Sequence, residues 1–286
     1  MILVTGAAGG IGRAACRCLA EAGILFRAAF HTQDDQEVRD MAVDTVKLDI
    51  ADQDSVRNAV KGIDAVLFVP PATPSLAAMT GTLLAALRDA EVKHLVKVSA
   101  YGEEESALSE LGAWHAAADT LVHNADIPNT LLHCLPFMQN IFYILDVMIK
   151  PRRAILLPCG GARVSHVDVR DIAAVACRVL AAPDAHAGKR YVLSGPEAVS
   201  YAQIAEMLSE QTGERIMYRD IPESDAARML TQMGLPETVA KAKLVSFRLE
   251  KENRRAYVSP HVAEITSRPA RSFRQFLSDY ARYFTL

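Results

Sequence analysis

Short apolar runs alternate with stretches of helical spacing through the first half of this 286-residue chain. Apolar residues at helical intervals, as from Ile11 to Ala22, indicate amphipathic helices. Runs that are apolar at nearly every position indicate strands buried on both faces. The pattern predicts strands at residues 2–5, 25–30, 45–49, 65–69, 95–99 and 130–135, and helices at 11–22, 55–60, 76–90 and 114–124.

This alternation predicts a doubly wound α/β fold. Strand–helix–strand units with right-handed crossovers build a parallel sheet that is covered by helices on both faces. After Pro151 strands and helices no longer alternate regularly. The elements expected there are helices at 171–180, 201–212, 228–249 and 272–284 and strands at 190–193 and 216–218. We expect a parallel-sheet domain over residues 1–150. A smaller α/β region over 151–286 should bind substrate and contribute partly back to the first domain.

Composition excludes several classes of protein. A hydrophobic fraction of 50% argues against general disorder, and a net charge of -3 lacks the basic excess of a nucleic-acid binder. No apolar run reaches the roughly 18 residues of a membrane span, and the first residues lack the basic segment of a signal peptide. The five cysteines contain no CxxC pair, so we expect no metal site. A cytoplasmic protein without a membrane or nucleic-acid partner is predicted.

The most informative segment is the glycine-rich turn TGAAGGIG at residues 5–12, between the first expected strand and helix. Gly6 permits a tight turn, Gly9 allows close approach of a diphosphate, and Gly12 allows the helix to pack on the strand. The free N–H groups of a helix N-terminus favour an anion there. The context predicts a Rossmann dinucleotide site formed by Gly6, Ala8, Gly9, Gly10, Ile11 and Gly12. A purely structural turn is the alternative.

The end of the second strand bears on the choice of cofactor. A site for the ribose 2′-hydroxyl needs an acidic residue about 20 positions after the glycines. That place holds His31 and Thr32, whereas Asp34 and Asp35 come slightly late. We therefore expect NADP(H) rather than NAD(H), with His31, Thr32 and Arg27 as candidates near a 2′-phosphate. The alternative for His31 is an exposed loop histidine without a cofactor contact.

The ends of the third and fourth strands supply further candidates. Ligands of open α/β sheets bind beyond the carboxyl ends of the strands. Asp49 and Ile50 are expected beside the adenine, and Phe68, Val69 and Pro70 behind the ribose and nicotinamide. Ordinary packing at strand ends is the alternative for each.

These segments together resemble the NmrA-like branch of the atypical or extended short-chain dehydrogenases/reductases. The resemblance runs through TGAAGGIG at 5–12, LDIADQDSVRNAVKGIDAVLFVPP at 48–71, KHLVKVSAYG at 93–102, HAAADTLVHNADIPNTLLHCLPFMQN at 115–140, HVDVRDIAAVACRVL at 166–180, KRYVLSGPEAVSYAQIAEML at 189–208 and SRPARSFRQFLSDYA at 267–281. It implies an NAD(P)-binding Rossmann fold. It also implies either an NAD(P)H-dependent quinone, dye or biosynthetic reductase or a non-catalytic nucleotide sensor.

The chain departs from the family at two positions. His133 stands where the family usually has arginine in a Leu-Arg-Pro segment. His31 stands where many NADP-binding relatives have arginine after the second strand.

The usual proton donor of short-chain dehydrogenases is absent, because none of the eight tyrosines is followed by lysine four residues later. By resemblance, His115 takes a position where quinone-reductase-like relatives carry histidine. It is expected near the nicotinamide ribose, with a pKa near neutrality and proton donation as a second role. Ser99 and Ala100 end the fifth strand, and Tyr101 is another candidate acid. Candidates for the substrate pocket are Trp114, Phe137, Met138 and Asn140. Core packing is the alternative for Phe137 and Met138, and covering the domain junction is the alternative for Trp114.

We predict an NAD(P)H-dependent oxidoreductase that transfers hydride to a small conjugated acceptor such as a quinone, imine or aromatic compound. Such acceptors take hydride without a strong protein acid, because the nicotinamide carries the difficult chemistry. The alternative is a non-catalytic nucleotide sensor with a regulatory protein partner. A sugar-nucleotide epimerase ranks below both, because it normally needs the Tyr/Lys pair. A monomer or homodimer is expected.

Overall fold

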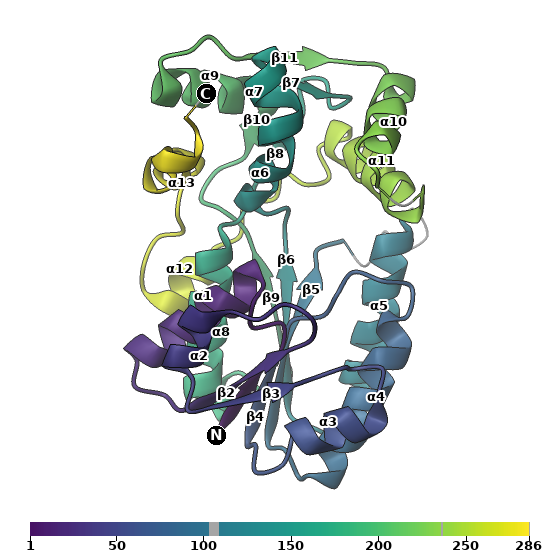
Figure 1. Ribbon diagram of the computed structural model, residues 1–286, viewed down its shortest axis with the longest axis vertical. Helices are drawn as coiled ribbons and strands as arrows, with labels where there is room; N and C mark the ends of the chain where they lie inside the picture. Colours follow the sequence, from purple (N-terminus) through teal and green to yellow (C-terminus); the bar gives the residue numbers. More distant parts are fainter. Residues whose placement is uncertain (103–108, 236, 286) are drawn as a thin grey trace. The chain divides into compact units, whose positions relative to one another are not determined.

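A seven-stranded parallel sheet dominates the computed structural model, which describes residues 1–102, 109–235 and 237–285. Its strand order is β3-β2-β1-β4-β5-β6-β9 (Figure 1). The strands are β1 (Ile2–Val4), β2 (Phe26–Phe30), β3 (Asp44–Lys47), β4 (Ala65–Phe68), β5 (His94–Ala100), β6 (Asn129–Cys134) and β9 (Lys189–Leu193). The order reverses between β1 and β4, which is the topological switch point where such folds bind nucleotides. The predicted doubly wound α/β class is confirmed.

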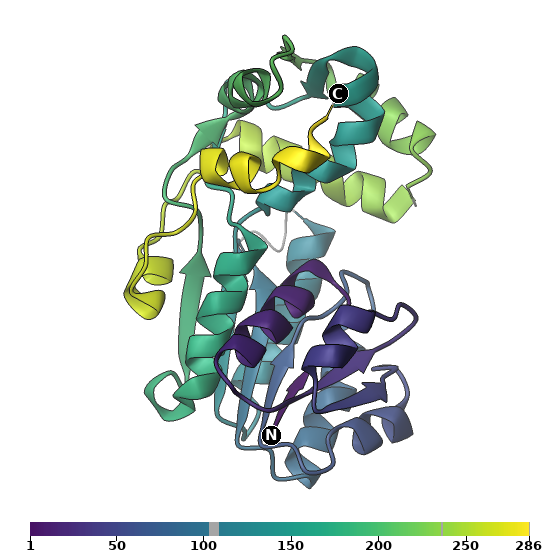
Figure 2. The same cartoon turned by 60° about the vertical axis from the view of Figure 1, so that its left-hand side comes forward.

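Helices cover both faces of this sheet (Figure 1). Helices α3, α4 and α5 lie on one face, and α1 and α8 pack side by side on the other (Figure 2). The bounds are α1 (Gly10–Glu21), α2 (Gln36–Met41), α3 (Gln53–Ala59), α4 (Leu76–Asp89), α5 (Glu110–His123), α8 (Val169–Ala181) and α12 (His261–Thr266), with a short 3-10 turn, η4 (Pro183–Ala185). The apolar core between the sheet and α3–α5 includes Leu3, Val66, Leu83, Leu95 and Val122.

The chain divides into two compact units with interleaved segments. Unit 1 comprises Met1–Cys134, Val169–Leu193 and His261–Ser267, and unit 2 comprises Leu135–Asp168, Ser194–Pro260 and Arg268–Leu286. The chain therefore first passes from unit 1 to unit 2 after Cys134, upstream of the expected boundary at residue 150. The physical reason is that the apolar side chains of Ile141, Leu145 and Ile149 belong to the core of unit 2.

Unit 2 is built from short helices around two two-stranded sheets. Its strands are β7 (Ala154–Leu157), β8 (Arg163–Val164), β10 (Val199–Ser200) and β11 (Met217–Asp220). Its helical elements are η2 (Met138–Asn140), α6 (Ile141–Ile144), the π-helical η3 (Leu145–Ile149), α7 (Lys150–Arg152), α9 (Tyr201–Thr212), α10 (Glu223–Gln232), α11 (Glu237–Lys251), α13 (Phe273–Asp279) and η5 (Ala281–Tyr283). Its core gathers aromatic rings around Phe276, which packs on Phe142, Tyr280 and Phe284. Among the described residues, no helix combines the length and apolar character needed to cross a bilayer.

Two helices of unit 1, α2 and α12, were absent from the expected elements. Residues 36–41 form α2, although their polar composition indicated a loop. The carboxylate of Asp35 caps this helix by accepting the N–H of Val38 at 3.1 Å. A single buried side chain, Val38, anchors it, which is too little apolar content to show a helical period.

Candidate active site

The glycine turn has the geometry that a dinucleotide site requires. Gly6 has φ of +60°, and a Cβ at Gly12 would lie 2.2 Å from the carbonyl oxygen of Gly6. A hydrogen bond of 2.9 Å from the Gly9 N–H to the Gly6 oxygen closes the turn. Thr5 Oγ1 accepts the N–H of Val69 at 2.9 Å and ties the turn to the end of β4. Only glycine fits at Gly12, because the clashing atoms belong to the backbone.

The turn opens into a pocket of about 560 Å³ along the carboxyl edge of the sheet. Helix α1 begins beside it, and Gly9 at its N-cap provides no side-chain hydrogen bond to the first N–H groups. A helix begun in this way has unpaired N–H groups for an anion. The predicted residues in the lining are Gly6, Ala8, Gly9, His31, Thr32, Asp49, Ile50, Val69 and Pro70. A lining of backbone and apolar groups around a glycine cradle fits a dinucleotide.

Seven of the predicted cofactor residues lie outside this lining: Gly10, Ile11, Gly12, Phe68, Ser99, Ala100 and His115. Gly10, Ile11 and Gly12 form the first turn of α1, and Phe68 is fully buried in the core of unit 1. Sequence reasoning also missed lining residues from the glycine turn, the end of β2, the loops after the strands and α4: Ala7, Ala29, Phe30, Gln33, Leu48, Pro71, Thr73 and Met79.

A second cleft of about 1070 Å³ continues from His31 and Thr32 over β3. It contains two basic side chains that the sequence did not single out, Arg39 and Lys47. The guanidinium of Arg39 lies 5.3 Å from the Phe30 ring centroid, and its Nε donates to Asp34 Oδ1 at 2.6 Å. The hydrogen bond from Arg39 lowers the pKa of Asp34. The cleft therefore places Lys47 and the Arg39–Asp34 ion pair beside the end of β2, with Asp49 and Asp52 in the same lining.

The acidic residues after β2 are both paired with arginine. Asp34 pairs with Arg39, and Asp35 pairs with Arg13. His31 is exposed, with its Nε2 at 3.9 Å from Asp49 Oδ2. Arg27, also a candidate for the cofactor, is absent from both linings, and its side chain binds other groups. Its Nε donates to Asp44 at 2.6 Å and one terminal nitrogen to the carbonyls of Ala59 and Lys61 at 2.8 and 3.0 Å.

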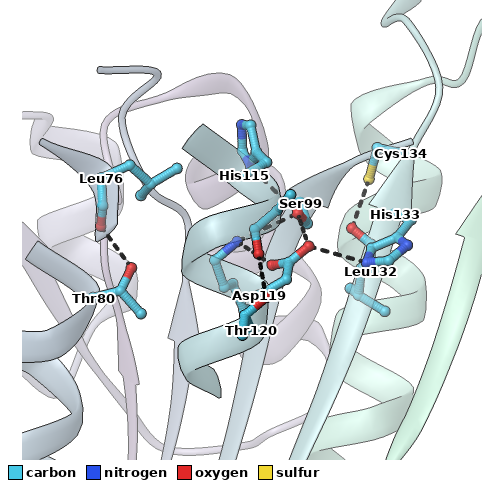
Figure 3. A network of polar contacts seen from close by, with 11 residues as sticks. Leu76, Thr80, Ser99, His115, Asp119, Thr120, Leu132, His133 and Cys134 are labelled. Atoms are coloured by element: carbon cyan, nitrogen blue, oxygen red, sulfur yellow. Dashed lines mark hydrogen bonds and ion pairs between the residues drawn. The ribbon is translucent and has the colours of Figure 1, made fainter. Parts of the chain in front are cut away.

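A buried polar network lies at the ends of β5 and β6 (Figure 3). Lys97 Nζ donates to Asp119 Oδ1 at 2.6 Å, and Ser99 Oγ donates to Asp119 Oδ2 at 2.6 Å. His133 Nε2 is 3.2 Å from Asp119 Oδ2, and His115 Nδ1 is 3.3 Å from Ser99 Oγ. The side chains of Lys97 and Asp119 are 0% and 1% exposed, so this is a desolvated ion pair.

Elementary periodicity explains why these side chains meet. Lys97 and Ser99 are two residues apart on β5 and so share a face of the sheet. Ser99 is opposite His133 in the β5–β6 register. His115 and Asp119 are four residues apart on α5 and share one side of that helix. His133, which replaces the arginine usual in the family, thus contacts a carboxylate.

The network sets the charge of its members. Burial acts to raise the pKa of Asp119, but His133, Lys97 and Ser99 outweigh it and lower the pKa well below its usual range. Burial and then the charge of Lys97 lower the pKa of His115 from 6.5 to about 4. The expectation of a pKa near neutrality for His115 was therefore wrong, because a cation is desolvated and repelled at this position.

A pH dependence of stability follows for His115. Between pH 6.5 and about 4 the unfolded histidine binds a proton that the folded one does not, so acidification through this window lowers the free energy of unfolding. Across the whole window, the one proton that only the unfolded His115 binds lowers the free energy of unfolding by about 3 kcal/mol. Urea unfolding at a series of pH values should show it, and His115→Gln should reduce the proton uptake on unfolding by about one. An unchanged pH slope in the variant would contradict the assignment.

The other predicted site residues lie at the end of β5, on α5 and in unit 2. Ala100 ends β5, and the backbone N–H of Tyr101 donates to the Cys134 carbonyl at 2.9 Å. Trp114 packs against the apolar core of unit 1. Phe137, Met138 and Asn140 belong to unit 2, where Met138 is buried in the core and Asn140 is exposed.

The sequence missed Lys97 and Asp119, although one signal pointed to them. A lysine inside the apolar strand LVKVS must find an anionic partner when it is buried. Among the described residues, no group of three or more His, Cys, Asp or Glu side chains is arranged to hold a metal.

Comparison with known proteins agrees with this geometry. The chain is 32% identical over 287 aligned positions to NAD(P)H azoreductase of Xenophilus azovorans, covering 99% of both chains. It is 33% identical over the same length to (4-alkanoyl-5-oxo-2,5-dihydrofuran-3-yl)methyl phosphate reductase of Streptomyces griseus subsp. griseus, again covering 99% of both.

Solved structures of the same fold include an NADPH-dependent quinone oxidoreductase of Escherichia coli in complex with NADPH. That structure matches with a TM-score of 0.87 and 21% identity, over 98% of this chain and 99% of the other. The model of the NmrA-like family matches residues 1–276. With its glycine turn and switch-point pocket, the chain belongs to the NmrA-like family, as its sequence motifs predicted.

Proposed function

We propose that this protein is an NAD(P)H-dependent reductase that delivers hydride to a small conjugated acceptor. The observation that carries the proposal is the pocket itself, where Gly6 and Gly9 meet the ends of β2 and β4. Full-length similarity to a named azoreductase supports catalysis over sensing alone. The nicotinamide supplies the hydride when bound. The turn at residues 6–12 binds the diphosphate, and the apolar lining excludes water from the reacting face.

The chain's own residues offer no tyrosine–lysine acid for the acceptor. His115 is neutral above about pH 4, because burial and Lys97 lower its pKa. Quinones and cationic imines or dyes suit such a site, because they accept hydride before any proton is needed. We propose this acceptor class, with Ser99 and His115 beside the nicotinamide ribose.

Titration and turnover together test the function. Purified protein is titrated with NADPH, NADH and their oxidised forms, and loss of the reduced cofactor is then followed with quinones, azo dyes and imines. We expect saturable binding and oxidation with at least one acceptor class. Oxidation with simple ketones but not with quinones or imines would overturn the acceptor class. Tight binding without oxidation by any acceptor would favour a nucleotide sensor.

NADP(H) is the proposed cofactor because of the charges beside His31. A 2′-phosphate binds well to a guanidinium, whereas a free ribose hydroxyl needs an unpaired carboxylate. Arg39 and Lys47 line the adjacent cleft, and Arg39 neutralises Asp34. The basic side chains in the cleft and the pairing of Asp34 and Asp35 with arginines both favour the phosphorylated cofactor.

Arg39→Gln should change this cofactor preference. Loss of a charge-assisted contact of about 1.5–3 kcal/mol corresponds to roughly 10–100-fold weaker NADPH binding. NADH binding should change by less than about threefold, because it makes no such contact. Fluorescence titration of both cofactors measures the ratio. Arg57→Gln is the matched control, since Arg57 pairs with Asp54 on α3 and is absent from both pocket linings. Equal losses for NADPH and NADH in Arg39→Gln would contradict the assignment.

A further inference from the structure

The single hydroxyl proton of Ser99 determines how the buried network is connected. Ser99 Oγ lies 2.6 Å from Asp119 Oδ2, 3.3 Å from Lys97 Nζ and 3.3 Å from His115 Nδ1. An ionised carboxylate only accepts hydrogen bonds, and bonds to it are the short, strong ones. The Ser99 proton therefore points to Asp119.

In its other two contacts, the Ser99 oxygen must then accept the hydrogen bond. Lys97 has only donors, so its contact satisfies this requirement. The contact with His115 is a hydrogen bond only if Nδ1 carries the imidazole proton. The His115 ring lies beyond Ser99, on the side away from Asp119 (Figure 3). Its Nε2, the nitrogen that does not face Ser99, is then left with a lone pair.

We propose that Asp119 and Lys97 are positioning residues that hold His115 as the Nδ1–H tautomer and make its Nε2 a hydrogen-bond acceptor. Asp119 acts through Ser99, whose hydroxyl it orients, and Lys97 keeps that carboxylate ionised. The group recognised by Nε2 is an O–H or N–H donor, of the kind carried by a ribose or a carboxamide.

This assignment narrows the chemistry of the proposed reductase, on which this part of the inference rests. The Ser99 proton is held by Asp119, and His115 has no proton on the nitrogen that faces away from the network. Neither residue then protonates the acceptor. A cationic iminium or dye becomes neutral when it gains a hydride, and the nicotinamide is oxidised, so charge and electrons balance without a proton. A quinone becomes a hydroquinone anion, which takes its proton from water.

His94, at the other end of β5, provides an internal control. Its Nε2 is 3.0 Å from Thr130 Oγ1, and Thr130 donates its own proton to the carbonyl oxygen of His186 at 2.8 Å. The same reasoning makes His94 an Nε2–H tautomer. Two buried histidines, one at each end of β5, are therefore expected in opposite tautomeric forms.

Nitrogen-15 NMR of histidine-labelled protein tests the proposal directly, and it needs neither cofactor nor turnover. Long-range proton–nitrogen spectra at neutral pH distinguish the two tautomers and the imidazolium, and His115→Gln and His94→Gln assign the signals. We expect Nδ1–H for His115 and Nε2–H for His94. His115 found as Nε2–H, or as imidazolium, would overturn the proposal while leaving the proposed function standing.

Variants separate positioning from a general structural effect. Ser99→Ala removes the acceptor and should convert His115 to the Nε2–H form, whereas Ser99→Thr should retain Nδ1–H. Asp119→Asn should shift the His115 signals in the same direction as Ser99→Ala, with the His94 pattern intact as evidence of folding. Thr130→Val should move the His94 signals only. A His115 pattern unchanged in both Ser99→Ala and Asp119→Asn would contradict the proposed relay.

Discussion

Gly12→Ala is expected to abolish dinucleotide binding while leaving a folded but weakened protein. A Cβ at this position would lie 2.2 Å from the Gly6 oxygen, 2.8 Å from the Gly6 carbonyl carbon and 2.9 Å from the Ala7 Cα. These are backbone atoms of the turn, so α1 must move away from it. We expect NADPH affinity to fall by at least about 100-fold, which corresponds to roughly 2.7 kcal/mol. Overpacking should lower the free energy of unfolding by about 1–3 kcal/mol.

Gly81→Ala is the matched control for this substitution. Gly81 lies inside α4, and a Cβ there would meet no atom within 4 Å. Alanine is the better helix former by about 1 kcal/mol, so this variant should be as stable as the parent or more so. Its NADPH affinity should be unchanged. Calorimetric titration measures both variants, and Gly12→Ala binding NADPH within threefold of the parent, on the order of 0.6 kcal/mol, would contradict the account.

Asp119→Ala is expected to be the most destabilising single change in unit 1. It removes the carboxylate 2.6 Å from Lys97, an ammonium that is 0% exposed. Breaking a buried ion pair by removing one partner costs about 3–5 kcal/mol, because the other charge stays desolvated. Chemical denaturation measures this loss. Replacing both partners, as Lys97→Met with Asp119→Leu, should recover much of it, since apolar isosteres of buried pairs are often neutral.

An exposed aspartate pair serves as the control. Asp146 pairs with Lys150 at 2.8 Å, with both side chains accessible to water. Asp146→Ala should cost less than about 1 kcal/mol, because solvent screens such pairs. A loss in Asp119→Ala no larger than that in Asp146→Ala would contradict the expected cost of leaving the Lys97 ammonium buried without its carboxylate.

The parallel sheet was predictable because its strands are local apolar runs bounded by turns. The glycine turn at 5–12 was predictable too, because the backbone conformation or close approach that requires each glycine is local to the turn. The seventh strand, β9, was recognised as a strand but not as a neighbour of β6. Pairing across more than 50 residues depends on tertiary packing rather than on local pattern.

The polar network marks the limit of prediction from sequence. Lys97 and Asp119 are separated by 22 residues and lie on different elements, so neither alone predicts the other. The position of the Arg39 charge beside the cofactor pocket could not be predicted for the same reason. Arg39 comes from a short helix that was expected as a loop, and it reaches the end of β2 only in the folded chain.

The most direct test of the central claim is transfer of a labelled hydride. The protein is mixed with NADPH carrying deuterium at the reactive nicotinamide carbon and with a cationic imine or dye, and the product is examined by mass spectrometry. We predict deuterium at the reduced carbon of the product, with transfer lost in Gly12→Ala and retained in Gly81→Ala. Cofactor that stays unbound at saturating concentration, or transfer that Gly12→Ala leaves intact, would contradict hydride delivery from this pocket.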